Sequence, residues 1–165
     1  EHIAGFQKGI APIKVCVDYA NGMGANESPQ IFAKIKGLEI VPLYETLDGT
    51  FPNHPADPIQ PENQRDLIAR VVEVGADVGL AFDGDADRVF LVDEQGVGLS
   101  GSTTTAILAD AILKSKPGGK VVHNLICSKA VAEVALVAVE HEQREHLRMG
   151  GRRIDDPHAH DRRAS

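Results

Sequence analysis

The stretch Val78–Asp93, VGLAFDGDADRVFLVD, holds two apolar runs on either side of the acidic hexapeptide DGDADR. Short runs rich in β-branched and aromatic residues, bounded by turn-forming residues, are typical of buried strands. The sequence therefore predicts strands at 78–82 and 89–93, joined by the hexapeptide. Ligands of α/β proteins bind beyond the carboxyl ends of the strands, so this connection is a candidate functional loop.

Strand and helix signals alternate over the rest of the chain. Further strands are predicted at 14–19, 39–44 and 120–126, and helices at 29–36, 62–74, 103–113 and 129–140. Pro42 indicates that its strand lies at an edge, and the four prolines of 51–61 exclude a helix there. Strands separated by helices predict an α/β fold: a three-layer α/β/α domain with a mixed, mainly parallel sheet, followed by a truncated second α/β domain.

The predicted boundaries are 8–99 for the first domain and 100–140 for the second. Residues 141–165 are rich in Arg, His and Asp and have few apolar residues, so we expect a disordered tail. The tail reads as though the coding frame had changed. His158 and His160 are too few ligands to predict a metal site there.

The composition excludes several functions. With a net charge of −7 over 165 residues, the protein lacks the basic surface that binding to nucleic acid or to an anionic membrane requires. No apolar run reaches the roughly 20 residues that span a bilayer, and residues 1–7 lack a signal-peptide pattern. The first residue is not Met, which is consistent with a cut from something longer. We expect a cytoplasmic protein in which Cys16 and Cys127 are buried thiols and not a disulfide.

Three carboxylates, Asp83, Asp85 and Asp87, alternate with small residues in the hexapeptide. Like charges this close repel, so at least one pKa is expected to rise unless a cation lies between them. Gly84 and Ala86 leave the loop room to curl, which would bring the three carboxylates together. Carboxylate oxygens are hard ligands that suit Mg²⁺ or Ca²⁺, so the loop is interpreted as a divalent-metal site.

Arg88 completes the hexapeptide, and a guanidinium in this position is suited to bidentate binding of a phosphate. The simpler alternative is an acidic surface turn that Arg88 neutralises. An EF-hand with Glu94 at position 12 also fits the spacing, but Arg88 would occupy its sixth position, where glycine is needed.

Gly79–Gly96 resembles the metal loop and flanking strands of the α-D-phosphohexomutases, the phosphomannomutase/phosphoglucomutase family, and matches their D-G-D-x-D-R signature. Three other stretches resemble the family in the same order. They are Val17–Gly24 (VDYANGMG), the FPNH and PEN residues of 51–63, and Lys120–Val131 (KVVHNLICSKAV). The resemblance covers 10–138, which corresponds to domain 2 and the start of domain 3.

The resemblance implies that Asp83, Asp85 and Asp87 hold a Mg²⁺ cofactor and that Arg88 is a catalytic residue that contacts the phosphoryl group near a phosphoserine. The substrate of the full-length parent would be a hexose phosphate of mannose or glucose. Its 1- and 6-phosphates would be interconverted through a bisphosphate, a reaction that depends on charge stabilisation and alignment. The resemblance leaves the choice of sugar and the substrate-binding residues open.

The family's phosphoserine loop and later segments are not found in these 165 residues, and Ile126 stands where some members have lysine. We therefore expect the chain alone to be inactive. The alternative is a non-catalytic Mg²⁺-binding fragment or a truncated gene product. His54 is expected to pack in its loop, His123 to be buried in a strand, and Asn21–Gly24 to form a tight turn.

Overall fold

The computed structural model describes residues 11–116 and 119–136. In chain order its elements are β1 (Ile13–Asp18), α1 (Gly24–Phe32), β2 (Leu38–Leu43), the 3₁₀ helix η2 (Pro61–Gln64), α2 (Arg65–Val74), β3 (Val78–Phe82), β4 (Val89–Asp93) and α3 (Gly101–Ser115). A further short helix covers 129–136. The chain divides into two compact units between Thr104 and Thr105, within α3.

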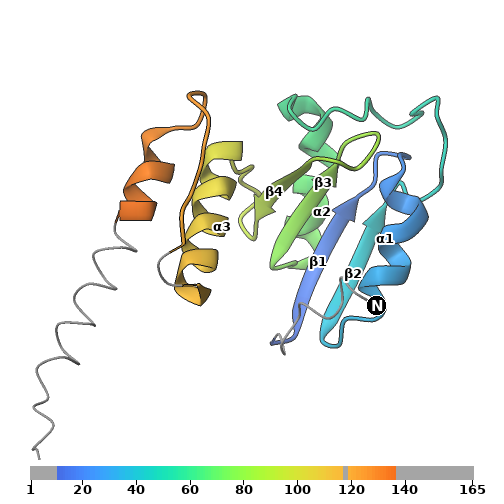
Figure 1. The fold of residues 1–165 in the computed structure, drawn as a ribbon. Helices are drawn as coiled ribbons and strands as arrows, with labels where there is room; N and C mark the ends of the chain where they lie inside the picture. Colours follow the sequence, from blue (N-terminus) through green and yellow to red (C-terminus); the bar gives the residue numbers. More distant parts are fainter. Residues whose placement is uncertain (1–10, 117–118, 137–165) are drawn as a thin grey trace, which may run out of the picture. The chain divides into compact units, whose positions relative to one another are not determined.

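The first unit is built on a four-stranded sheet in the order β2-β1-β3-β4 (Figure 1). β1 runs parallel to β2 and β3, whereas β4 is antiparallel to β3. These pairings confirm the predicted α/β fold with a mixed, mainly parallel sheet, and they place β2 with its Pro42 at an edge. Because β1, β2 and β3 run in the same direction, the segments that follow them all leave the sheet at the carboxyl ends of these strands. This end of the sheet is called the carboxyl edge.

Apolar side chains cover both faces of the sheet. Successive residues of a strand point to opposite faces, and in β1 Cys16 packs with Leu67 and Val71 of α2. Val15 and Val17, on the other face, belong to a cluster that includes residues of α1. The sheet therefore lies between α1 and α2 as the middle of three layers (Figure 1).

The predicted start of the first helix at Ser28 and Pro29 is wrong, because α1 spans Gly24–Phe32 with Pro29 inside it. The cause lies outside the helix. Met23, the residue before α1, donates its N–H to the carbonyl of Gly84 at 2.9 Å. This tertiary hydrogen bond fixes the chain where the helix starts and overrides the local preference for a serine cap.

The predicted helix at 62–74 is confirmed as η2 followed by α2, and Gly75 ends it in a left-handed conformation with φ +60°. Leu67 and Val71 are fully buried, as expected of its apolar side. Val72, predicted on the same side, is 57% exposed. The contact face of α2 is thus narrower than the run of apolar residues.

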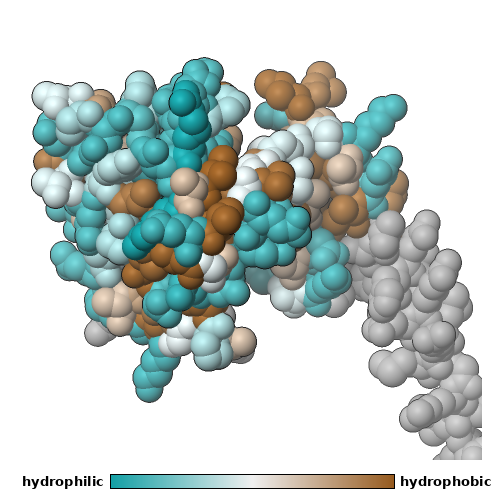
Figure 2. Space-filling model, turned by 180° about the vertical axis from the view of Figure 1, so that it is seen from behind, coloured by the Kyte–Doolittle hydropathy of each residue, from teal (hydrophilic) through white to brown (hydrophobic). Residues whose placement is uncertain are grey.

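The predicted strand at 120–126 is not formed, and three of its apolar residues are almost fully exposed: Val122 at 96%, Leu125 at 102% and Ile126 at 90%. A strand needs a neighbour to satisfy its backbone, and none of the described strands pairs with this segment. His123, predicted to be a core histidine, is exposed as a consequence. Apolar side chains standing at the surface appear in brown in Figure 2.

Both cysteines are free thiols; Cys16 is buried as predicted, whereas Cys127 is only half-buried. The predicted helix at 129–140 is present over 129–136. Two predictions lie outside the described residues: the end of that helix and the 141–165 tail with its two histidines. Within the described parts of the chain, no helix is long and apolar enough to cross a membrane.

Candidate metal centre

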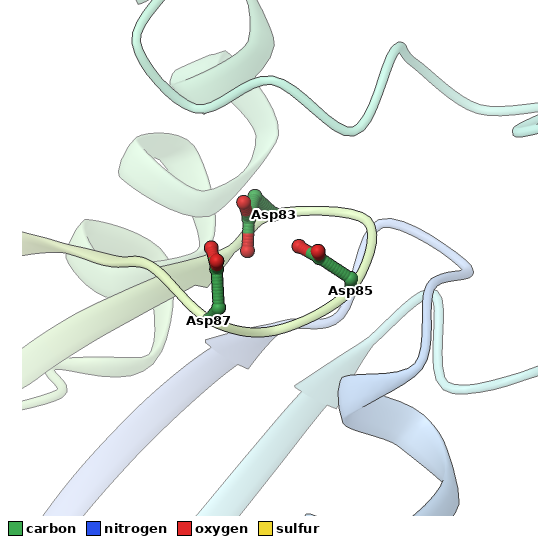
Figure 3. Close-up of side chains that lie close together, drawn as sticks. All are labelled: Asp83, Asp85 and Asp87. Atoms are coloured by element: carbon green, nitrogen blue, oxygen red, sulfur yellow. The ribbon is translucent and has the colours of Figure 1, made fainter.

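The acidic loop connects β3 to β4 beyond the carboxyl end of β3. Ala86 has φ +60°, and its N–H donates to the carbonyl of Asp83 at 3.1 Å, so the loop curls as its small residues predict. The carboxylates of Asp83, Asp85 and Asp87 converge on the inside of the loop (Figure 3), with one oxygen of each within 4.8 Å of the others. Since Mg²⁺ and Ca²⁺ hold oxygens at about 2.1–2.6 Å, one such ion can contact all three.

Asp83 is the buried member of the group, with 1% of its surface exposed, whereas Asp85 and Asp87 are exposed. Its Oδ1 accepts a hydrogen bond from the backbone N–H of Arg88 at 3.1 Å. Its Oδ2 lies 2.6 Å from Nη2 of Arg88, but the approach lacks hydrogen-bond geometry. This oxygen is therefore neutralised by an ion pair without a well-aligned hydrogen bond, and it could still bind a metal ion. These residues therefore fit a divalent cation.

Arg88 neutralises part of the charge. Its guanidinium contacts Asp83 at 2.6 Å and Asp87 at 3.2 Å. This is the ion pairing that the acidic-turn alternative predicts. Asp85, however, forms no ion pair within the described residues, so the neutralisation is incomplete.

Arginine also sets the pKa of Asp83. Burial acts to raise that pKa, but the backbone N–H and the positive charge of Arg88 outweigh burial and lower it. Asp83 is therefore not a carboxylate whose pKa rises, because a cationic side chain already stands beside it. With 56% of its side chain exposed, Arg88 is accessible to a ligand from outside the loop.

Unusual backbone conformations gather around the loop. Five non-glycine residues among those described have positive φ, between 46° and 60°. They are Ala20, Asn21, Tyr44, Phe51 and Ala86, and all lie in segments that follow β1, β2 or β3. Left-handed conformations are unfavourable for L-residues and are characteristic of functional sites. The described non-glycine residues with a left-handed backbone are therefore concentrated at the carboxyl edge of the sheet.

A buried pair that the sequence analysis did not predict lies at the same edge. Asp18, 1% exposed at the end of β1, faces Nε2 of His54 at 3.0 Å. Nδ1 of His54 lies 2.9 Å from the Pro55 carbonyl. A carbonyl only accepts, so this contact is a hydrogen bond when Nδ1 carries the proton. Burial, partly offset by the Ala20 N–H and by His54, raises the pKa of Asp18. His54 thus packs in its loop, as expected, with both nitrogens engaged.

The fold and the site together define a three-layer α/β domain with a loop at the carboxyl edge of its sheet whose three carboxylates could hold a divalent cation. The family model described as phosphoglucomutase/phosphomannomutase, alpha/beta/alpha domain II, matches residues 2–96. The chain therefore belongs to the phosphoglucomutase/phosphomannomutase family.

Individual relatives agree with this assignment. The chain is 40% identical to a phosphomannomutase/phosphoglucomutase of Pseudomonas putida over 129 residues. This match covers 78% of the chain and 28% of that protein. It is 40% identical over 119 residues to a phosphomannomutase of Salmonella montevideo, covering 70% of the chain and 26% of that protein.

A solved structure of a phosphoglucomutase/phosphomannomutase family protein from Burkholderia thailandensis superposes with a TM-score of 0.77 at 33% identity. The match covers 82% of this chain and 30% of that one. The chain thus spans between a quarter and a third of the length of these relatives.

Proposed function

We propose that residues 83–88 of this chain are the metal loop of a phosphohexomutase. In this loop Asp83, Asp85 and Asp87 would be the ligands of Mg²⁺. The main support is the convergence of three carboxylates around Asp83, whose buried Oδ2 has an ion pair with Arg88 but no hydrogen bond. When bound, Mg²⁺ supplies positive charge that stabilises a phosphoryl group during transfer. The relatives are named for mutases of this kind, which makes a hexose phosphate of mannose or glucose the proposed substrate of the complete protein.

Arg88 is proposed as the catalytic residue that contacts the phosphoryl group. Its guanidinium is exposed and lies beside the carboxylates, so it can turn toward a phosphate at the mouth of the loop. Guanidinium binds phosphate bidentately, which aligns the group as well as neutralising it. Domain 2 is proposed to cover 8–99 and the beginning of domain 3 to cover 100–140.

Mg²⁺ titration of the wild type and of Asp85→Asn by calorimetry tests the metal site. The wild type should bind one ion, and Asp85→Asn should bind it about tenfold more weakly or not at all, because affinity follows the charge of the ligand set. Asp110→Asn, an equal change of charge at an exposed position on α3, is the matched control and should bind as the wild type does. Equal affinities for all three proteins would contradict the proposal.

The 165 residues alone are proposed not to convert a hexose phosphate, because the resemblance assigns the phosphoryl donor to a serine loop outside them. A coupled assay with mannose 1-phosphate and glucose 1-phosphate on the purified chain tests this expectation. Turnover that is lost in Asp85→Asn would contradict it and would assign activity to the chain itself. Binding of Mg²⁺ without turnover is the expected result.

A further inference from the structure

Asn21 stands where three segments at the carboxyl edge meet, and all of its polar groups are engaged. Its backbone N–H donates to the Tyr44 carbonyl at 3.0 Å, and its own carbonyl accepts from the Asp48 N–H at 3.0 Å. Its Nδ2 donates to the Thr46 carbonyl at 2.7 Å. Its Oδ1 accepts from Nδ2 of Asn53, also at 2.7 Å. One side chain thus ties the segment after β1 to the segment after β2 and to the proline-rich segment.

The position requires an asparagine. Asn21 is 5% exposed and has φ +58°, a left-handed conformation that asparagine tolerates better than most residues. Its amide must donate on one side and accept on the other. An aspartate at this position would face the Thr46 carbonyl with a second acceptor. The hydrogen bonds therefore fix both the orientation of the side chain and the path of the backbone.

The residues that follow Asn21 contact the metal loop directly. A methyl group on Gly22 would lie 2.8 Å from the carbonyl oxygen of Gly84, so the two backbones are in close contact. Met23 donates its N–H to the same carbonyl at 2.9 Å. From the proline-rich segment, atoms of Phe51 and Ala56 lie 3.5 Å from the position that a Cβ on Gly84 would take. Gly84 separates the first two aspartates of the loop, so both segments pack against a residue that lies between two proposed metal ligands.

We infer that Asn21, with Asn53 as its partner, is a positioning residue for the metal loop. Neither asparagine touches the proposed ion. Their hydrogen bond sets the distance between the two segments that hold Gly84, and thereby the approach of the carboxylates on either side of it. The inference rests on the proposed metal site and extends it to residues that lie outside the acidic hexapeptide.

The experiment changes Asn53 and not Asn21. Asn53 is exposed, so its replacement removes the hydrogen bond between the two asparagines and leaves the buried Asn21 in place. The full chain is prepared as wild type, Asn53→Ala and Asn53→Asp, and Mg²⁺ affinity is measured by calorimetry well below the unfolding temperature. Loss of groups that orient metal ligands costs about 10–100-fold in affinity. We expect a loss near the lower end for Asn53→Ala and a larger loss for Asn53→Asp, whose carboxylate would face Oδ1 of Asn21.

The aspartate variant separates geometry from charge. An added negative charge near the loop would strengthen Mg²⁺ binding if electrostatics alone mattered, whereas a positioning role requires weaker binding. Ile68→Ala is the stability control, because Ile68 packs against the α2 side of the core. It should lower the unfolding temperature without changing Mg²⁺ affinity.

Amide hydrogen exchange in metal-free protein gives a second readout. Exchange at the Met23 N–H should accelerate in Asn53→Ala. The Asp77 N–H, which donates to the Lys14 carbonyl in the same unit, should exchange as in the wild type.

Three outcomes would contradict the inference. Wild-type Mg²⁺ affinity in both Asn53 variants would overturn it without contradicting the proposed metal site. Absence of Mg²⁺ binding in the wild type would overturn both. Equal acceleration at Met23 and Asp77 would indicate a general loss of stability and would also overturn the inference.

Discussion

Residues 11–104 and 105–136 contain apolar runs of the same kind, yet the two regions bury them differently. In β1, Val15, Cys16 and Val17 are at most 4% exposed, because β1 lies between two strands and two helices. In the segment 120–126, Val122 and Leu125 are almost completely exposed. The comparison shows that apolar character alone does not create a strand: a neighbouring strand and a covering layer must also be present.

The helices of the two regions differ in the same way. α2 buries Leu67 and Val71 completely in the sheet. α3 buries Leu113 beside the smaller Ala106 and Ala109, but it leaves Ile107, Leu108 and Ile112 more than half exposed. Stability is therefore expected to be concentrated in the first region, and four sets of variants test that difference and the contacts within the first region on which it depends.

The largest difference should come from removing a leucine in each region. Leu67→Ala leaves a cavity against the sheet and should lower the free energy of unfolding by about 3–4 kcal/mol. Leu125→Ala removes an exposed side chain and should change it by less than about 0.5 kcal/mol. Urea unfolding followed by far-ultraviolet circular dichroism measures both. Similar losses would show that 120–126 is buried in solution.

A methyl group added at the edge of the sheet should have the next largest effect. Gly22→Ala places Cβ 2.8 Å from the Gly84 carbonyl, and the resulting backbone shift should destabilise the first region by about 1–3 kcal/mol. Gly49→Ala is the matched control, because nothing lies within 4 Å of its Cβ position. Thermal unfolding should separate the two variants. Equal unfolding temperatures would contradict the close contact between the two turns.

An exchange of alanine for glycine should act in opposite directions in the two regions. Ala86→Gly relieves a left-handed residue in the metal loop and should stabilise the fold by up to about 1 kcal/mol, after allowing for the greater freedom of glycine when unfolded. Ala109→Gly, within α3, should destabilise by about 1 kcal/mol. Urea unfolding measures both variants. A loss of stability in Ala86→Gly would mean that the loop adopts another conformation.

The smallest expected effect is a pH dependence confined to the first region. The raised pKa of Asp18 means that the folded protein binds more protons there than the unfolded chain. The Asp18 contribution is thus fully present below its ordinary pKa of 3.8 and is lost as pH rises through the raised value. Asp83, with a lowered pKa, acts in the opposite sense and below 3.8.

Urea unfolding of the wild type and Asp18→Asn over a series of pH values isolates this contribution. The stability of the wild type relative to Asp18→Asn should fall as the pH rises above 3.8. A difference that does not change with pH would contradict the assignment.

Local sequence patterns predicted those strands and helices whose formation depends mainly on residues close to them in the chain. The apolar runs indicated β1, β3 and β4, the proline indicated that β2 lies at an edge, and the acidic hexapeptide indicated the loop in which the three carboxylates converge. The same reasoning failed at 120–126, where the pattern of a buried strand is present without a pairing strand in the described sheet. It also misplaced the start of α1, because a hydrogen bond from Met23 to Gly84 outweighs a serine cap.

The contacts around the metal loop could not be predicted from local patterns, for a different reason. Asn21 and Asn53 are 32 residues apart, and His54 is 36 residues from Asp18. Their contacts depend on the path of the proline-rich segment, which has no periodicity to read. The rule that ligand sites gather at the carboxyl ends of parallel strands indicated the neighbourhood. It did not indicate which side chains would meet there.

The left-handed residues around the metal loop have a consequence for how a cation would bind. Their unfavourable backbone conformations are adopted when the domain folds and are held by the sheet and by interlocking turns. The chain therefore has little left to reorganise when an ion arrives, and little conformational entropy is lost at that step. A loop of the same composition on a flexible tether would have to become ordered upon binding, and its affinity would be correspondingly lower.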